Sequence, residues 1–184
     1  VEWCLEYCRR NRTADGVVAS DSDELEGRFP VGRTNLATSA LYYDALLSAA
    51  ALGREIGVKP SQTNAYLRQA RELAAAIERF FGRDVAGYHA YRYSEINDKL
   101  RAWICMPLVI GLSERRERTV AALLGPELHT EDGLLTEQGD SVFWDRSTLY
   151  ALRGIFRAGC ADKAGDFLHR FTARRLTGNH VPYF

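Results

Sequence analysis

Four carboxylates crowd one short stretch of this sequence. The stretch DGVVASDSDELEGRFPVG runs from 15 to 32, and an arginine, Arg28, follows its carboxylates. Among carboxyl groups this close together, one can hold a proton near neutral pH while an arginine keeps a neighbour ionised. The stretch therefore predicts a site for proton transfer. Four of its five acidic residues lie within six positions; they are Asp21, Asp23, Glu24 and Glu26.

Aromatic and polar residues gather in three other segments, at 88–98, at 129–147 and near the end of the sequence. Aromatic rings stack on the apolar faces of sugars, and carboxylates accept hydrogen bonds from sugar hydroxyls. We therefore expect a carbohydrate ligand, an oligosaccharide or a glycoside. The side chains expected to bind it are Asp21, Arg28, Tyr91, Trp144, Asp145, Arg146 and His180.

Helical patterns dominate the elements that must position these segments, and alternating patterns typical of strands are almost absent. The stretches 36–54 and 102–113 carry almost no charge, which predicts helices buried on all sides. The stretches 61–81 and 161–176 carry one apolar stripe each, which predicts outer helices with one face in water. The helices expected lie at about 1–9, 36–54, 61–81, 99–112, 114–124, 146–158 and 161–176.

The connections between these helices alternate in length. Inner helices pass to outer ones through short turns, and outer helices return through the long segments that hold the carboxylates and aromatics. Gly53, Gly111 and Gly159, each expected to close an inner helix, lie 58 and 48 residues apart. Such spacing indicates repeated helical hairpins. We predict an all-α fold, an incomplete α/α toroid, with residues 1–184 forming a single region of hairpins within a larger catalytic domain.

The order of these pieces resembles the six-hairpin glycosidases, most closely the catalytic domain of α-L-rhamnosidase-like enzymes. The resemblance implies an (α/α)6 barrel, about half of which is present, and hydrolysis of glycosidic bonds, usually with inversion. Such hydrolysis needs two carboxyl groups, one to protonate the leaving oxygen and one to activate water. The segments that carry the resemblance are SDELEGRFP, LATSALYYDALLSAAALGREIG, AYLRQARELAAAIERFFG and FWDRSTLYALRGIFRAG.

The resemblance implies two alternative positions for the general acid. In trehalase-like and α-glucosidase-like members the acid lies four residues before an Arg-aromatic pair, which here is Arg28-Phe29 and gives Glu24, with Asp23 as the second candidate. In rhamnosidase-like members this loop binds substrate, and the acid would lie before Val1. The tryptophan usual beside the acid is absent here. In both cases the general base would follow Phe184.

Three structural interpretations compete with the catalytic and sugar-binding roles assigned above. Acidic clusters in loops are often simply solvated, and Asp98 and Asp145 are typical of helix N-caps. Trp103 lies in a stretch without charge, which favours the core over a sugar platform.

A non-catalytic α/α-repeat scaffold that binds a glycan or a protein is one alternative function. Another α/α-toroid enzyme, such as a polysaccharide lyase, is a second. The crowding of like charges favours the glycosidase.

Composition argues against several other classes. Lys+Arg and Asp+Glu are both 24, so the sequence lacks the basic excess of a nucleic-acid binder. No apolar run reaches the roughly 18 residues of a membrane span. Cys4 and Cys8 have no further ligands nearby, so we expect no metal and no cofactor. The four cysteines do not suggest a disulfide framework.

Localisation stays open, with a periplasmic or secreted bacterial enzyme among the options. The expected partners are the glycoside substrate and the remainder of the catalytic domain.

Overall fold

The computed structural model describes residues 1–23 and 29–175. Within these ranges the chain is mainly helical, with seven α-helices and one 3-10 helix, as the sequence predicts for an all-α protein. The helices are α1 (Glu2–Arg10), α2 (Leu36–Glu55), α3 (Pro60–Phe81), η1 (Ala102–Cys105), α4 (Met106–Ile110), α5 (Arg116–Leu123), α6 (Asp145–Arg157) and α7 (Ala161–Arg175). Two short strand pairs are β1 (Gly82–Val85) with β2 (Tyr88–Tyr91), and β3 (His129–Thr130) with β4 (Gly133–Leu134).

The chain forms two compact units. Unit 1 comprises Val1–Asp84 and Tyr91–Asp98, and unit 2 comprises Val85–Ala90 and the chain from Lys99 onward. The backbone therefore passes between the units three times, after Asp84, after Ala90 and after Asp98. The segment 91–98 belongs to unit 1 although unit 2 contains the residues on both sides of it.

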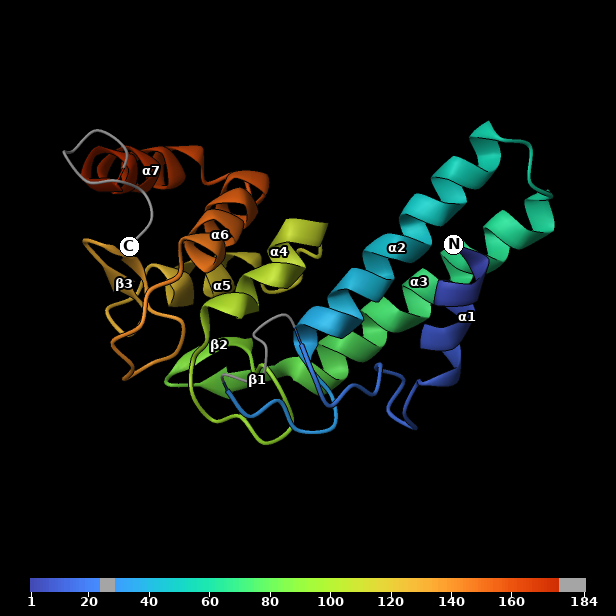
Figure 1. Cartoon of the computed structure of the whole chain (residues 1–184), viewed down its shortest axis with the longest axis horizontal. Coiled ribbons are helices and arrows are strands. Elements are labelled where there is room, and N and C mark those ends of the chain that lie inside the picture. The colour runs from blue at the N-terminus through green and yellow to red at the C-terminus, as the bar shows by residue number, and fades with distance from the viewer. Residues whose placement is uncertain (24–28, 176–184) are drawn as a thin grey trace. The chain divides into compact units, whose positions relative to one another are not determined.

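Unit 1 is built on the long hairpin of α2 and α3, which lie side by side, with α1 packed against α2 (Figure 1). Leu46, Leu73 and Ile77 have no exposed surface in this unit. Burying such a side chain stabilises the fold by about 1.5–3 kcal/mol. At Gly53, inside α2, a Cβ atom would lie 2.9 Å from Cγ2 of Thr63 in α3. The absence of a side chain there lets the two helices approach closely.

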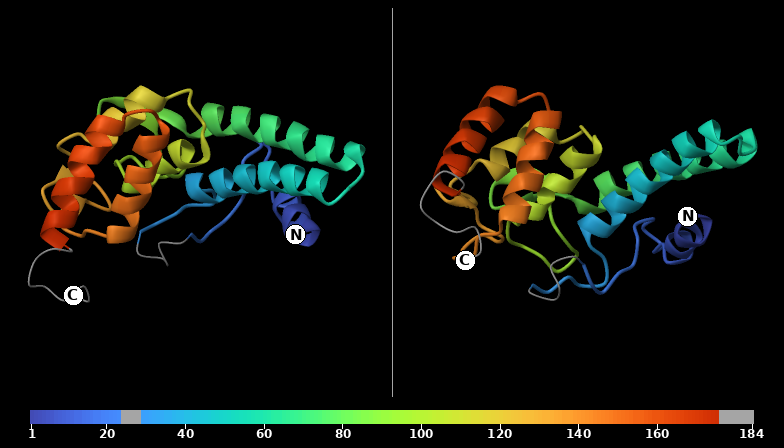
Figure 2. Two further views of the ribbon diagram at one scale, coloured as in Figure 1. Left: turned by 90° about the horizontal axis from the view of Figure 1, so that it is seen from above. Right: turned by 45° about the horizontal axis from the view of Figure 1, so that its top comes forward.

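Unit 2 packs α6 against η1, α4 and α7, and α5 against η1 (Figure 2). Trp103 of η1 is 1% exposed and is one of the largest fully buried side chains. At Gly154 of α6 a Cβ atom would lie 3.0 Å from the Cβ of Leu108 in α4. A side chain at position 154 would therefore push α4 and α6 apart.

The observed structure of residues 99–112 differs from the single helix predicted there. Residues before Ala102 are extended, because Arg101 pairs with Glu137 in a β-bridge and the Ala102 N–H donates to Thr136 O at 3.1 Å. A 3-10 turn follows, and α4 begins with Pro107 in its first turn. Proline has no N–H to donate to the preceding turn, which breaks the longer helix in two.

The two predictions about the helix at 36–54 have different outcomes. Leu41 and Leu52 of α2 are 49% and 50% exposed within the described chain. Burial of this helix on all sides, which was expected in a larger domain, therefore stays a prediction. The expectation that Gly53 closes the helix is wrong, because Gly53 lies within α2. By contrast Gly111 does cap α4, with φ of 84°, and the left-handed conformation there is the one that glycine adopts without strain.

Candidate active site

The acidic loop, defined here as residues 20–34, starts and ends beside the N-terminus of α2. Its two limbs are joined by the Ser20 N–H, which donates to Arg33 O at 2.9 Å, and by a bridge between Ala19 and Thr34. Asn35 links the loop to the helix. Its Oδ1 caps α2 by accepting from the Thr38 N–H at 2.8 Å, and its Nδ2 donates to Ser22 O at 3.1 Å. The loop is thus attached directly to the first turn of α2.

Glu95 holds the second limb of the acidic loop. Its carboxylate accepts hydrogen bonds from the Arg33 N–H, from the Thr34 N–H at 3.1 Å and from the Thr34 hydroxyl at 2.7 Å. Burial raises the pKa of Glu95, but the hydrogen bonds from Thr34 and Arg33 together outweigh burial and leave the pKa below its usual value. Glu95 is therefore a charged acceptor that fixes the turn at Gly32.

Tyr93 holds the first limb. Its side chain is fully buried, and its hydroxyl donates to Oδ2 of Asp23 at 2.5 Å. The backbone of Tyr93 is fixed in turn, because Leu36 N–H at the start of α2 donates to Tyr93 O at 2.8 Å. Tyr93 and Glu95 stand two residues apart, so one short segment, 93–95, contacts both limbs of the loop.

Sequence reasoning placed Tyr93 and Glu95 in an aromatic segment without assigning them this role. The structure has a bend at Tyr93, a bridge at Ser94 and a turn at Glu95, so no strand-like alternation in the sequence signals this role. Ser94 is itself fully buried and bridges to Asn35.

The predicted site residues of unit 1 have different surroundings. Asp21 is exposed and Asp23 is half-buried. Phe29, the aromatic member of the Arg28-Phe29 pair, is 9% exposed and packs into unit 1 with Val31. Tyr91 is 1% exposed, and its hydroxyl donates to Glu78 of α3. A phenol so enclosed is not presented to a ligand in this structure. Glu24, Glu26, Arg28 and His180 lie outside the described residues.

Unit 2 brings together a separate group, the Trp-Arg cluster, defined as Trp103, Trp144, Arg146 and Tyr150. The guanidinium carbon of Arg146 lies 5.3 Å from the ring centroid of Trp144 and 5.8 Å from that of Trp103. Tyr150 packs on Trp103 with ring centroids 5.4 Å apart. Cation–π contacts of this kind are worth about 0.5–1 kcal/mol at exposed sites.

The members of the Trp-Arg cluster differ in accessibility. Trp103 is buried, as expected for a core residue, whereas Trp144 is half-buried and Tyr150 is 36% exposed. Trp144 is the N-cap residue of α6 and Asp145 is the first residue of the helix, so the N-cap expected at Asp145 lies one position earlier. No helix begins at Asp98 either. The half-buried ring of Trp144 lies beside the Arg146 cation, and an aromatic ring is a group that can stack against a sugar ring.

A buried ion pair supports unit 2 close to this cluster in sequence. Arg101 Nε lies 2.6 Å from Glu137 Oε2, with side chains 3% and 14% exposed. Lys99 Nζ lies 3.9 Å from the other carboxylate oxygen. Charge-assisted hydrogen bonds between buried partners fix geometry strongly, since separating the partners leaves a charge without water. The pair ties the segment before η1 to the segment 133–138.

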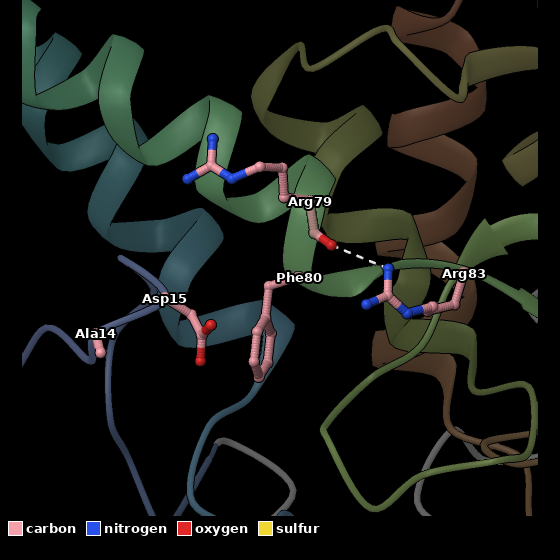
Figure 3. Close-up of a pocket in the computed structure, with 5 residues that line it drawn as sticks. All are labelled: Ala14, Asp15, Arg79, Phe80 and Arg83. Carbon is pink, nitrogen blue, oxygen red and sulfur yellow. Dashed lines mark hydrogen bonds between the residues drawn. The ribbon is translucent and has the colours of Figure 1, made fainter.

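A shallow hollow of about 260 Å³ lies elsewhere in unit 1, lined by Ala14, Asp15, Arg79, Phe80 and Arg83 (Figure 3). Figure 3 shows the Asp15 carboxylate beside the Phe80 ring and the Arg83 guanidinium turned back toward the end of α3. That guanidinium donates to Arg79 O at 2.9 Å and to Gly82 O at 2.8 Å. None of the predicted site residues that the structure describes lines this hollow.

The described residues contain no group of three or more His, Cys, Asp or Glu side chains placed to hold a metal ion. Cys4, Cys8, Cys105 and Cys160 form no disulfide with one another, and Cys4 is exposed. Of the helices in residues 1–23 and 29–175, none combines the length and the apolar character needed to cross a membrane.

Comparison with known proteins gives a likeness in fold. Neutral trehalase Nth1 from Saccharomyces cerevisiae superposes with a TM-score of 0.65 over 88% of this chain, at 15% sequence identity. The match takes in 36% of the trehalase, so this chain spans about a third of that protein's length. Neither a family model nor a curated protein matches the sequence. The likeness confirms the predicted fold class, a partial α/α toroid built of helical hairpins.

Proposed function

We propose that this chain is part of a glycoside hydrolase of the six-hairpin type that acts on an α-glycosidic bond. The observation that carries the proposal is the anchoring of the acidic loop at both limbs, by Tyr93 at Asp23 and by Glu95 at Thr34. A group that transfers a proton must be held at a fixed distance from the bond that breaks. A merely solvated acidic loop needs no such support. The fold shared with a trehalase supports the same proposal.

In this proposal Glu24 is the general acid that protonates the leaving oxygen, by its spacing from Arg28-Phe29. Asp23 is the second candidate, but its carboxylate already accepts a hydrogen bond from Tyr93, which suits an acceptor of sugar hydroxyls better than a proton donor. Arg28 would hold a neighbouring carboxylate in its charged form. No carboxylate of this chain is assigned as the general base, which the resemblance assigns to the segment that follows α7.

We propose sugar-binding roles for Trp144 and its neighbours Asp145 and Arg146 of unit 2 and, separately, for Asp21 of unit 1. His180 keeps the same proposed role. Stacking on an aromatic ring with polar groups around it is the usual way in which proteins hold a pyranose. Tyr91 is left out of this set because it is 1% exposed. Whether the sugar is a rhamnoside or a glucoside is the finer question that a substrate panel would answer.

The test uses the full-length protein that contains this sequence, assayed on trehalose, oligosaccharides, and aryl α-L-rhamnosides and α-glucosides. We expect Glu24→Gln to lower turnover of natural glycosides by about 100- to 10,000-fold and to spare activated aryl glycosides in part, since these need little protonation. The isolated 184-residue chain should be inactive, because inversion needs a second carboxylate roughly 6.5–9.5 Å away.

Two outcomes would contradict the assignment. If Glu24→Gln and Asp23→Asn each left natural turnover within about threefold of wild type, the loop would bind substrate and the acid would lie elsewhere. Glycan binding without turnover of any glycoside by the wild-type protein would favour the non-catalytic scaffold.

A further inference from the structure

We propose that the hollow at the end of α3 binds a small phosphorylated sugar, with Arg79 and Arg83 at the phosphate group and Asp15 at the sugar hydroxyls. The hollow has a volume of about 260 Å³, and all the residues that line it belong to unit 1. They are Ala14, Asp15, Arg79, Phe80 and Arg83 (Figure 3). None of them has a role in the proposed hydrolysis, so this site does not depend on that function.

Arginine side chains supply the positive charge around the hollow. Arg79 and Arg83 are exposed, whereas Arg92 is half-buried, with its guanidinium carbon 4.7 Å from the centroid of the Phe80 ring. The Nε of Arg92 also donates to Phe80 O at 3.0 Å, which holds this third cation against a residue that lines the hollow. Within residues 1–23 and 29–175, none of the three arginines forms an ion pair with a carboxylate. An anion from solvent would therefore find their charges available.

Repulsion between two of these cations affects the pKa of Arg92. This pKa lies below its usual value, first because of burial and second because of the charge of Arg83. Glu95 and Asp15 act in the opposite direction but do not restore the usual value. An anion bound beside Arg83 would offset the repulsion, since opposite charges at close range stabilise each other.

The size and the donors of the hollow favour a small phosphate ester. A guanidinium matches a phosphate group with two parallel N–H···O bonds. The two bonds by which Arg83 holds the end of α3, to Arg79 O and to Gly82 O, both use Nη1, so its other N–H groups can serve a ligand. The volume is below the roughly 300–1,000 Å³ of pockets for drug-sized ligands, which limits the ligand to about the size of one sugar phosphate.

Asp15 favours a sugar phosphate over the free anion. Figure 3 shows its carboxylate beside the ring of Phe80. A carboxylate repels a phosphate dianion but accepts hydrogen bonds from hydroxyl groups, and an aromatic ring packs on the apolar face of a sugar. The lining thus combines arginines for the phosphate with a carboxylate and a ring for the sugar.

The arginines still have to converge on the ligand. In Figure 3 the guanidiniums of Arg79 and Arg83 extend in different directions from the end of α3. Arg79 is exposed, so an anion can draw its side chain inward, and ordering the side chain lowers the affinity. We therefore expect a dissociation constant of about 0.1–2 mM, typical of a weak site.

The experiment is titration calorimetry of the full-length protein that contains this sequence, with glucose 6-phosphate and inorganic phosphate as probes at a constant ionic strength of about 0.15 M. We expect glucose 6-phosphate to bind about tenfold more tightly than inorganic phosphate. Arg79→Gln and Arg83→Gln should each raise the Kd of glucose 6-phosphate by about five- to tenfold, because each removes charge-assisted hydrogen bonds.

Two further variants locate and identify the ligand. Asp15→Ala should weaken glucose 6-phosphate by about threefold and tighten inorganic phosphate by about twofold, because it removes both a hydroxyl acceptor and a like charge. Arg71→Gln is the matched control, since it removes the same charge from an exposed position of the same helix. It should change either Kd by less than about twofold.

Several results would overturn the proposal. Equal losses of affinity in Arg71→Gln and Arg79→Gln would show attraction by general surface charge. An unchanged Kd in Arg79→Gln would place the ligand elsewhere, and this variant decides should Arg83→Gln not fold. Tighter binding of both probes to Asp15→Ala would indicate a site for a free anion. Absence of saturable binding of glucose 6-phosphate up to about 20 mM would exclude the site.

Discussion

The carboxylate of Glu95 occupies the space that a side chain at Gly32 would need. A Cβ atom on Gly32 would lie 2.6 Å from Oε1 of Glu95 and 2.8 Å from its Cδ. Gly32 also has φ of +66°, in the left-handed region that other residues rarely adopt. Glycine at this position is thus required for two independent reasons, one conformational and one steric.

We predict that Gly32→Ala lowers the free energy of unfolding by about 2–4 kcal/mol, from backbone strain of about 1–2 kcal/mol and from displacement of the Glu95 carboxylate. The control is Gly57→Ala, where φ is +75° but nothing lies within 4 Å of the new Cβ. This variant should lose the strain contribution only. Urea unfolding measures both. Equal losses in the two variants would show that the contact with Glu95 does not matter.

Glu95 should make stability depend on pH. Its pKa is lower in the folded chain than in the unfolded chain, so its contribution is fully present above the unfolded pKa of about 4.3 and is lost as the pH falls through the folded value. At pH 7, Glu95→Gln should cost about 1–3 kcal/mol, the range of hydrogen bonds to charged groups.

The difference between wild type and Glu95→Gln should shrink in acid, as measured by urea unfolding across a pH series. Glu72→Gln serves as the control, because the Glu72 side chain is 63% exposed and its ion pair with Arg12 is long, at 3.5 Å. That variant should stay close to wild type at every pH. A difference for Glu95→Gln that persisted unchanged below pH 4 would contradict the assigned charge state.

Breaking the Arg101–Glu137 ion pair should be costly. Arg101→Met leaves the Glu137 carboxylate, 14% exposed, beside Lys99 at 3.9 Å, and should lower the free energy of unfolding by about 3 kcal/mol. Arg174→Met removes exposed contacts with Glu131 and Asp132 and should cost less than about 1 kcal/mol. Added salt should weaken only the exposed contacts. Similar losses in both variants would argue that Arg101 contributes no more than a surface charge.

Trp103 and Trp144 should respond differently to truncation. Trp103 is 1% exposed in unit 2, so Trp103→Ala should cost about 3–5 kcal/mol of stability. Trp144→Ala should cost much less and should weaken binding of a glycoside, measured by titration calorimetry on the full-length protein. The assignment would be refuted by equal destabilisation of the two variants, with unchanged affinity in Trp144→Ala.

Much of the helical framework could be predicted because its signals are local. The apolar spacing from Tyr66 to Phe80 is sufficient to place α3, whose observed range Pro60–Phe81 agrees with the predicted 61–81. The helix expected at 99–112 was wrong because its start depends on the bridge between Arg101 and Glu137, which are 36 residues apart in sequence. Pairing over such a separation leaves no trace in the spacing of apolar residues.

The candidate site could be predicted only in outline. The carboxylates of the acidic loop are visible in the sequence, but the residues that hold them are not, since Tyr93 and Asp23 lie 70 positions apart. Composition also cannot distinguish one aromatic residue of a loop from another. Tyr91 was expected to bind the ligand, and its side chain is enclosed by unit 1 instead. Trp103 was placed correctly because its neighbours in sequence carry no charge.

The three passages of the backbone between the units restrict how this chain can be divided. Neither unit is one uninterrupted stretch, so a single cut by a protease releases neither of them whole. A gene fragment ending at Asp84 would encode the acidic loop without Tyr93 and Glu95, the two side chains that hold it. The smallest contiguous piece that contains the loop and both of its supports therefore extends past Glu95. Recombination or circular permutation can preserve the held loop only if residues 20–34 stay in the same molecule as Tyr93 and Glu95.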